Sequence, residues 1–197
     1  MKEYFLPLIS KREIATDTMA FEFTKPKKFK FIAGQTIDVT VGTRIYTFSI
    51  AASPDEPVLR IATRMRPDSV FKNNLKKIKI GGKVRIQGPS GDFVLPKNTK
   101  KRIIMVAGGI GITPFYSMIK SNPPHKISLF YKNSSSARAA FLDELKQFKI
   151  LNLKLKISNN ALYYLAGPPG FVATYRTILD EGGVNEDNIR TEEFSGY

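Results

Sequence analysis

The sequence predicts two unlike halves, a small antiparallel β-barrel or sandwich followed by a doubly wound sheet of parallel strands and helices. The first half contains short apolar runs separated by Gly, Pro and Asp, which is typical of antiparallel structure. These runs are Thr36 to Val41, Val58 to Ala62 and Val84 to Gln87. The pattern changes at the polar stretch 96–101, which we take as the link. Beyond it, apolar runs alternate with helical patterns, as in a parallel sheet.

The second half supplies the elements that a parallel sheet requires. Ile103 to Ala107 and Ile127 to Tyr131 are apolar runs of strand length. Two further segments repeat apolar residues at positions i, i+1, i+4 and i+7, so each has one apolar helical face. Their apolar residues are Phe141, Leu142, Leu145 and Phe148 in one segment, and Phe171, Val172, Tyr175 and Ile178 in the other.

The composition excludes several kinds of chemistry. With 197 residues, 42% of them hydrophobic, the chain can bury a core as one large domain or two small ones. It has no cysteine and a single histidine, His125, which we expect in a solvated loop. Disulfides, thiolate or histidine-rich metal sites and cysteine nucleophiles are therefore excluded. Any redox chemistry would need a bound organic cofactor.

Charge and hydropathy bear on partners and location. The 31 Lys and Arg outnumber the 17 Asp and Glu, and the net charge of +14 favours an anionic partner. Nucleic acid, an acidic membrane surface, a phosphorylated cofactor and an acidic protein all qualify. No segment approaches the ~20 apolar residues that span a bilayer, and the amino terminus has no apolar run of signal-peptide length. We therefore expect a soluble cytoplasmic protein without a membrane span.

Two glycine-rich turns each join a predicted strand to a predicted helix. The first is Gly108 to Gly111, followed by Thr113-Pro114. Glycines let the backbone approach a ligand closely, and free N–H groups at a helix start bind phosphate. The spacing is not G-x-G-x-x-G, and a tight turn without a ligand is the alternative interpretation. The second turn, Gly167-Pro168-Pro169, would lie at the same carboxyl edge of the sheet, where ligands bind in open α/β folds.

One predicted strand combines a cation, aromatic rings and hydroxyl groups. Alternation places Arg44, Tyr46 and Phe48 on one face, and Thr47 and Ser49 on the other. A guanidinium can clamp a phosphate, an aromatic ring can stack on a planar cofactor, and a hydroxyl can bond to a ring nitrogen. An ordinary exposed strand is the alternative interpretation.

Six motifs follow one another along nearly the whole chain. In order, they are Arg44-x-Tyr46-Thr47, Ser69-x-Phe71-Lys72, Gly88-Pro89-x-Gly91-x-Phe93, Gly108-Gly109-Ile110-Gly111-Ile112-Thr113-Pro114, Gly167-Pro168-Pro169 and Glu193-Phe194-Ser195-Gly196-Tyr197. This order resembles the ferredoxin–NADP reductase superfamily, and six ordered motifs are far more specific than one. The resemblance implies an FAD-binding antiparallel β-barrel over residues 1–97 and an NAD(P)-binding α/β domain with a parallel sheet over residues 98–197.

The resemblance implies that the first half holds FAD. Arg44 would hold the FAD pyrophosphate, Tyr46 would pack on the isoalloxazine, and Thr47 would bond near flavin N5. Ser69 and Lys72 would complete the phosphate cradle at a helix start. The implied FAD-binding set is Arg44, Tyr46, Thr47, Phe48, Ser49, Arg64, Ser69, Val70, Phe71, Lys72, Phe194 and Tyr197, with Phe194 or Tyr197 over the other flavin face.

The resemblance also implies that the second half receives NAD(P)H as co-substrate. Thr113 would lie near the nicotinamide, and Glu192 or Glu193 would relay a proton, so that Thr47, Thr113 and Glu192 form the implied catalytic set. No metal site is implied. The implied NAD(P)-binding set is Gly109, Gly111, Thr113, Pro114, Lys132, Arg138, Gly167, Pro168 and Pro169.

Three departures from the family pattern matter. Ala166 stands where the family often has Cys, so we expect altered rate or coenzyme affinity rather than lost chemistry. Without cysteines there is no cluster-bearing ferredoxin-like extension, so the electron acceptor would be a separate molecule. Only residues 159–161 separate Leu153 to Ser158 from Leu162 to Leu165, too few for a parallel crossover. Leu153 to Ser158 is therefore a hairpin arm or irregular edge, or a segment is absent.

That short connection also leaves the coenzyme open. Lys132, Arg138 and residues 134–136 could bind a 2′-phosphate, which favours NADPH, or could form a solvated loop.

The resemblance predicts a flavin-dependent oxidoreductase that takes hydride from NAD(P)H and passes electrons to a separate acceptor. The positive charge favours an acidic acceptor protein such as a ferredoxin or flavodoxin. The alternative is an electron-transfer subunit of a larger complex with little activity alone. Nucleic acid ranks last and is not expected as a partner, because the Lys and Arg are scattered and no binding motif accompanies them.

Overall fold

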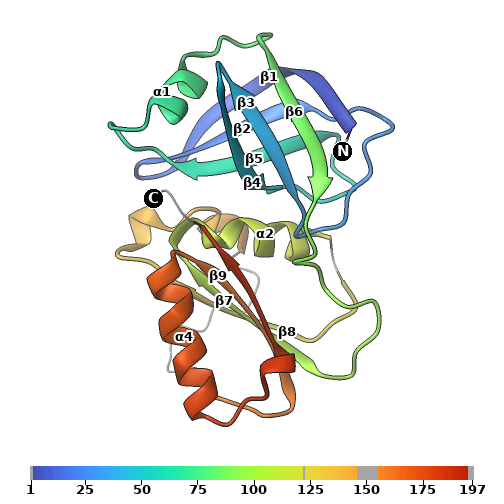
Figure 1. Cartoon of the computed structure of the whole chain (residues 1–197), viewed down its shortest axis with the longest axis vertical. Coiled ribbons are helices and arrows are strands. Elements are labelled where there is room, and N and C mark those ends of the chain that lie inside the picture. The colour runs from blue at the N-terminus through green and yellow to red at the C-terminus, as the bar shows by residue number, and fades with distance from the viewer. Residues whose placement is uncertain (1, 122, 146–154, 195–197) are drawn as a thin grey trace.

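The protein is described by a computed structural model over residues 2–121, 123–145 and 155–194. Figure 1 shows two sheets, an antiparallel one in the N-terminal half above a parallel one in the C-terminal half. Residues 91–101 connect the last strand of the first sheet to the first strand of the second. The predicted change from antiparallel to parallel structure is therefore confirmed.

The antiparallel sheet has six strands among the described residues, in the order β4-β3-β6-β1-β2-β5. The long strand β1 joins its two parts, because it pairs with β6 through Lys2 to Pro7 and with β2 through Leu8 to Ala15. This pairing confirms the antiparallel half but does not show the predicted closure into a barrel. The strands are β1 (Lys2–Ala15), β2 (Thr18–Thr24), β3 (Thr36–Val41), β4 (Arg44–Ser49), β5 (Val58–Arg64) and β6 (Lys83–Ser90).

Alternating apolar residues explain how this sheet folds. Ile37 and Val39 of β3 and Ile86 of β6 are fully buried, while their polar neighbours face outward. Helix α1 (Val70–Lys77) inserts Phe71 and Leu75 into the same core. This packing holds the start of α1 beside strand β4, which is where the predicted FAD residues lie.

The parallel sheet has four strands in the described residues, ordered β10-β9-β7-β8. Helix α2 packs on the face toward the antiparallel sheet, and helix α4 covers the other face. The predicted strands at 103–107 and 127–131 and the predicted helix at 171–178 are confirmed. The elements are β7 (Arg102–Gly108), η1 (Gly109–Gly111), α2 (Ile112–Lys120), β8 (Ile127–Lys132), η2 (Ser136–Arg138), α3 (Leu142–Leu145), β9 (Ala161–Gly167), α4 (Pro169–Glu181), η3 (Glu186–Asn188) and β10 (Ile189–Glu193).

The helix predicted from Phe141 to Phe148 is confirmed over its described part, Leu142 to Leu145, but its first residue is corrected. Phe141 lies before α3 with φ of 59°, in the left-handed region. The Phe141 ring stacks on Tyr116 with ring centroids 4.0 Å apart. Tertiary packing against α2 therefore takes Phe141 out of the helical register. Phe148 lies outside the described residues.

The chain between α3 and β9 forms no strand in its described part, residues 155–158. Leu155 packs against the cluster under α4, and both the N–H and the C=O of Ser158 bond to the Tyr163 hydroxyl. Of the alternatives given above, an irregular edge agrees with this segment, while residues 153 and 154 lie outside the described ranges. β9 takes the place beside β7 directly.

The two sheets are joined by hydrogen bonds between α2 or β9 and the N-terminal half. Ser117 Oγ donates to the Ala52 carbonyl at 2.6 Å, and the Tyr164 hydroxyl donates to the Val94 carbonyl at 2.9 Å. These contacts set the C-terminal end of β10 against β4. Among the helices in the described ranges, none combines the length and apolar character needed to cross a bilayer.

Candidate functional site

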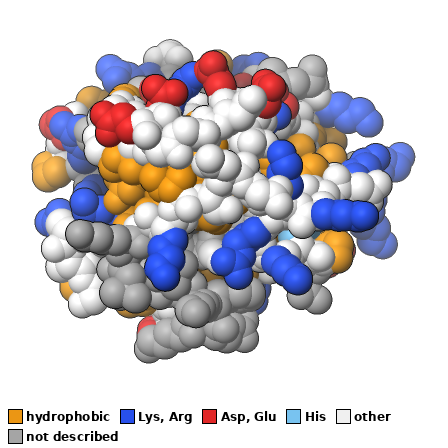
Figure 2. All heavy atoms as spheres, turned by 90° about the horizontal axis from the view of Figure 1, so that it is seen from below, with side chains coloured by type: hydrophobic (Ala, Val, Ile, Leu, Met, Phe, Trp, Pro, Cys, Tyr) orange, Lys and Arg blue, Asp and Glu red, His pale blue; other side chains and the backbone are white. Residues whose placement is uncertain are grey.

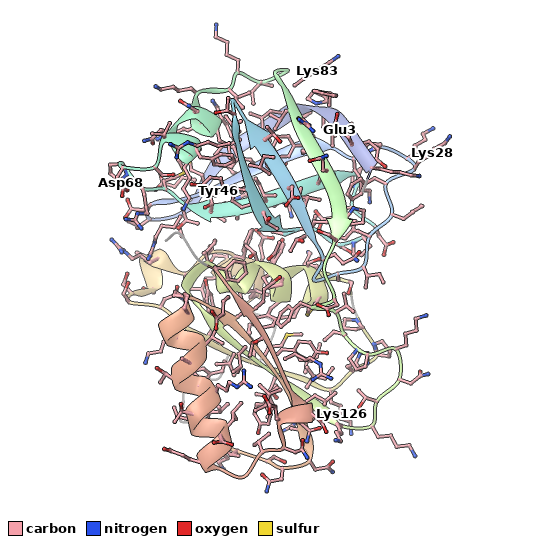
Figure 3. All side chains as sticks on the ribbon, viewed as in Figure 1. Glu3, Lys28, Tyr46, Asp68, Lys83 and Lys126 are labelled. Atoms are coloured by element: carbon pink, nitrogen blue, oxygen red, sulfur yellow. The ribbon has the colours of Figure 1, made fainter. Side chains whose placement is uncertain are left out.

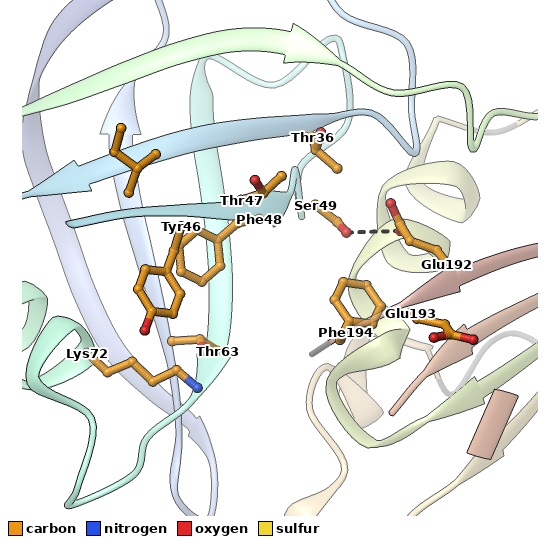
Figure 4. A pocket seen from close by; sticks show the side chains of 11 residues that line it. Thr36, Tyr46, Thr47, Phe48, Ser49, Thr63, Lys72, Glu192, Glu193 and Phe194 are labelled. Carbon is orange, nitrogen blue, oxygen red and sulfur yellow. Dashed lines mark hydrogen bonds between the residues drawn. The ribbon is translucent and has the colours of Figure 1, made fainter. Parts of the chain in front are cut away.

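A pocket of about 310 Å³ lies where the two sheets meet (Figure 4). Strand β4 forms one wall and the end of β10 forms the opposite one. Most of the lining was predicted from sequence, but Thr36, Ile45 and Thr63 were missed. The lining residues are Thr36, Ile45, Tyr46, Thr47, Phe48, Ser49, Thr63, Lys72, Glu192, Glu193 and Phe194. A hydroxyl directly after the apolar pair Ile61-Ala62 of β5 was the available signal for Thr63, which is 1% exposed.

The aromatic wall is built on Phe71, a buried residue of α1. The Tyr46 ring stacks on Phe71 with centroids 4.3 Å apart and planes 27° apart. Phe48 lies on Phe71 at 5.9 Å. Because Phe71 fixes both rings from behind, Tyr46 borders the pocket in a defined orientation. An aromatic face of this kind suits a flat ring system.

A buried cation, Lys72, forms the floor of the pocket. The residue is 3% exposed, and Figure 4 shows its amino group reaching toward Thr63. Burial lowers the pKa of Lys72 to about 8; Arg66 and Arg64 lower it further, and Asp68 raises it. Ser69 caps α1 by accepting a hydrogen bond from the Lys72 N–H at 3.4 Å.

A serine and a carboxyl group face each other across the pocket. Ser49 Oγ donates to Glu192 Oε2 at 3.2 Å, drawn as the dashed line in Figure 4. Burial raises the pKa of Glu192 to about 7; the Ser49 hydrogen bond lowers it and the charge of Asp92 raises it. Glu192 can therefore hold or release a proton near neutral pH.

Thr47 lines the pocket but its hydroxyl points to a partner that sequence analysis missed. Thr47 Oγ1 donates to Asp38 Oδ1 on the neighbouring strand β3 at 2.6 Å. The two residues are directly paired in the sheet register. The pairing depends on register, for which the sequence carried no signal.

The two glycine turns meet at the carboxyl edge of the parallel sheet, as predicted. Gly108 pairs with Lys132, and Gly167 pairs with Glu193. Gly109 has φ of +56° and open space around it, so its backbone is accessible to a ligand. A Cβ on Gly111 would lie 2.2 Å from the Ala166 carbonyl oxygen. The first turn therefore needs glycine at position 109 for its positive φ and at position 111 for lack of space.

Thr113 takes part in that turn rather than in the pocket lining. It is 3% exposed, and its hydroxyl donates to the Ile110 carbonyl at 3.0 Å. Pro114 is also buried, in the first turn of α2, whereas Pro168 and Pro169 are exposed at the start of α4. The carboxyl edge thus presents backbone from both turns, with Thr113 held inside.

The predicted phosphate-binding cations lie in different surroundings. Lys132 is exposed at the end of β8, while Arg138 makes an ion pair with Asp17 at 3.1 Å. Arg44, Arg64 and Val70 lie outside the pocket lining, with Arg44 and Val70 exposed. Tyr197, predicted over the flavin, is outside the described residues.

Comparison with known proteins supports the prediction that the first half of the chain binds FAD. Residues 5–95 match the family model described as oxidoreductase FAD-binding domain. The flavohemoprotein of Bacillus subtilis (strain 168) is 28% identical over 240 residues, covering 98% of this chain and 60% of its own length. This chain therefore spans less than two thirds of that curated relative.

Solved structures agree in fold. Phthalate dioxygenase reductase, described as a modular structure for electron transfer from pyridine nucleotides to [2Fe-2S], has a TM-score of 0.85 and 26% identity, over 99% of this chain and 70% of its own. The flavohem-like FAD/NAD binding domain of nitric oxide dioxygenase from Vibrio cholerae O1 biovar El Tor shares the fold, with a TM-score of 0.84 at 18% identity over 96% and 98% of the two chains. Residues 5–95 therefore belong to the oxidoreductase FAD-binding domain family, and the chain as a whole has the two-sheet fold of these reductase structures.

Proposed function

We propose that this chain is a reductase module that binds FAD between its sheets, receives hydride from NADPH and delivers electrons to a separate acidic protein. The observation that supports this proposal most directly is the pocket. There Tyr46, Lys72 and the Ser49–Glu192 pair converge beside the carboxyl edge of the parallel sheet. The proposed division is an FAD-binding barrel over residues 1–97 and an NAD(P)-binding domain over residues 98–197.

The residues around the pocket fit FAD. Tyr46 supplies an aromatic face, and Lys72 brings a positive charge to the pocket lining, which suits an anionic cofactor. The exposed Arg44 and the start of α1 at Ser69 are placed beyond the lining, where a cofactor longer than the pocket would extend. In this proposal Arg44, Ser69 and Lys72 hold phosphate, and Phe194 covers the ring from the β10 side.

FAD, when bound, supplies the capacity to take a hydride and release single electrons, which no side chain offers. The protein's own residues position the reactants and control protons. Tyr46 orients the ring, and the turn at Gly109 accepts the dinucleotide phosphates through its exposed backbone. Ser49 and Glu192 hold a proton at Glu192 Oε2, at the side of the pocket that faces the second half. Thr47 holds the Asp38 carboxylate, and Thr113 holds the Ile110 carbonyl of the glycine turn.

NADPH is favoured over NADH by the charge at the carboxyl edge. Lys132 and the serines at 134–136 follow β8, and no Asp or Glu occurs between Asp92 and Asp143. A 2′-phosphate would find a cation there and no repelling carboxylate on that segment. Arg138 would have to leave Asp17 to contribute, so Lys132 is the main determinant in this proposal.

The acceptor is proposed to be an acidic electron carrier such as a ferredoxin or flavodoxin. The net charge of +14 provides long-range attraction to such a partner. Phthalate dioxygenase reductase, by its description, passes electrons to a [2Fe-2S] centre.

The test is a visible spectrum of the purified protein followed by anaerobic titration with NADH and NADPH. A yellow protein bleached quickly by NADPH is expected. A polypeptide that stays colourless after incubation with FAD would contradict the proposal.

A second candidate is a subunit that needs another polypeptide for turnover. It is favoured by the chain spanning only 60% of the B. subtilis relative. Full FAD occupancy with slow reduction by both coenzymes would identify it.

A further inference from the structure

A second pocket, of about 440 Å³, lies at the opposite edge of the parallel sheet. Its lining comes from the link before β7, with Lys97, Asn98, Thr99 and Lys100, and from the loop before β8, with Pro124 and His125. The loop before β8 is tied to the start of β7, since the Ile103 N–H donates to the Lys126 carbonyl at 3.0 Å. The pocket is therefore formed where both strands begin, not where they end.

This edge is far from the dinucleotide turns. Arg102 and Gly108 are the two ends of β7, so about 20 Å of strand separates the pocket from the glycine turn. Figure 3 places Lys126 at the far end of the C-terminal half, away from Tyr46. A ligand here would not compete with FAD or the dinucleotide for space.

The local charge is strongly positive. Between Asp92 and Asp143 the sequence contains no Asp or Glu. Lys97 and Lys100 line the pocket, and the exposed Arg102 and Lys126 flank it. Figure 2, viewed from this end of the molecule, shows Lys and Arg side chains in blue across the face. Such a cluster attracts anions and has no neighbouring carboxylate within its own segment to neutralise it.

An unsatisfied polar atom points to a ligand as well. His125 lies in a loop, as expected, but its Nδ1 is buried and has no hydrogen-bond partner among the described residues. His125 as a whole is partly exposed, and only this atom of its ring is shielded from solvent. Buried polar atoms are nearly always bonded to protein, water or a ligand. Thr99 Oγ1 accepts from the Lys101 N–H at 3.1 Å, so its own proton is available to donate.

We propose that this pocket binds the phosphate group of a small phosphorylated ligand. Lys97 and Lys100 supply charge, Thr99 and Asn98 supply neutral donors, and the His125 ring lines the wall beside them. The volume lies within the range of about 300–1,000 Å³ typical of small-molecule sites. Because the site joins the link to the parallel sheet, its occupation would stabilise the folded state.

The test uses the one histidine of the chain as a unique reporter. The FAD-loaded, ¹⁵N-labelled protein, saturated with NADP⁺, is titrated with inorganic phosphate and with pyrophosphate at constant ionic strength, while the imidazole resonances are followed. We expect a saturable one-to-one shift. In the double variant Lys97→Ser/Lys100→Ser the affinity should fall by about tenfold or more, since two charge-assisted contacts are lost.

The matched control is Lys27→Ser/Lys28→Ser, which removes the same charge from exposed lysines of the N-terminal half. This variant should bind phosphate like the unmodified protein. A linear, unsaturated shift, or equal weakening in both double variants, would overturn the proposal because it would indicate general charge screening. Binding of RNA or of acidic vesicles without a saturable shift by phosphate or pyrophosphate would also overturn it. The same titration of the flavin-free protein follows the same histidine, so failure of FAD binding would not remove this readout and the two proposals are separable.

Discussion

Glu192 is an acidic residue of the pocket whose protonation depends strongly on its surroundings. Burial raises its pKa to about 7, so the folded protein binds this proton more tightly than the unfolded chain. The stabilisation is therefore fully present below about pH 4.5, the ordinary value, and is lost as the pH rises to about 7. Glu192→Gln should remove this dependence.

The measurement is the unfolding free energy of flavin-free protein in urea from pH 4.5 to 7.5. Relative to Glu192→Gln, the unmodified protein should lose about 1–3 kcal/mol across that range. Glu193→Gln, a change at the exposed neighbour, should follow the unmodified protein. Parallel curves for Glu192→Gln and the unmodified protein would show that the Glu192 pKa is not raised.

Lys72 should contribute directly to FAD retention. Lys72→Met keeps the buried stem but removes the charge at the pocket floor. The dissociation constant for FAD should rise about tenfold to a hundredfold, since a hydrogen bond to a charged group contributes about 1.5–3 kcal/mol. Flavin fluorescence on titration measures this constant. Lys76→Met, on the exposed last turn of α1, is the control, and an equal effect from both variants would argue against a specific role.

The turn between β7 and α2 leaves no room for one added carbon at Gly111. In Gly111→Ala the new Cβ would lie 2.2 Å from the Ala166 carbonyl oxygen, so backbone must shift. We expect a stability loss of about 2–3 kcal/mol and weaker NADP⁺ binding. Thermal unfolding and a dinucleotide titration measure the two effects.

The control for Gly111→Ala is Gly170→Ala, at the residue that directly follows the second glycine turn. A Cβ there meets nothing within 4 Å, so this variant should stay close to the unmodified protein in stability. If Gly111→Ala is equally well tolerated, the close approach of the two turns is not required for the fold.

The charge of the whole molecule should govern the encounter with its electron acceptor. At a net charge of +14, attraction to an acidic protein is long-ranged and is screened by salt. The second-order rate of acceptor reduction should fall about tenfold or more between low and physiological ionic strength. Stopped-flow reduction of a ferredoxin tests this, with a neutral quinone as control. A rate that does not change with salt would rule out electrostatic steering.

The sequence by itself determined the two kinds of sheet, the helix of Phe171 to Ile178 and most residues of the pocket. These features depend on local periodicity and on glycine and proline in turns, which a single chain segment carries. The motif order along the chain then predicted the FAD-binding domain that the family model matches over residues 5–95. Even so, the motifs gave residue types near the site rather than the contacts among them.

Only the tertiary structure decided which groups pair. Thr47 bonds to Asp38 because of strand register, and Ser49 meets Glu192 from 143 residues away because the sheets are joined. Packing on Tyr116 likewise removed Phe141 from its predicted helix. Each of these outcomes depends on contacts between segments distant in sequence. Local pattern cannot encode such contacts, because their free energy arises only when the segments meet.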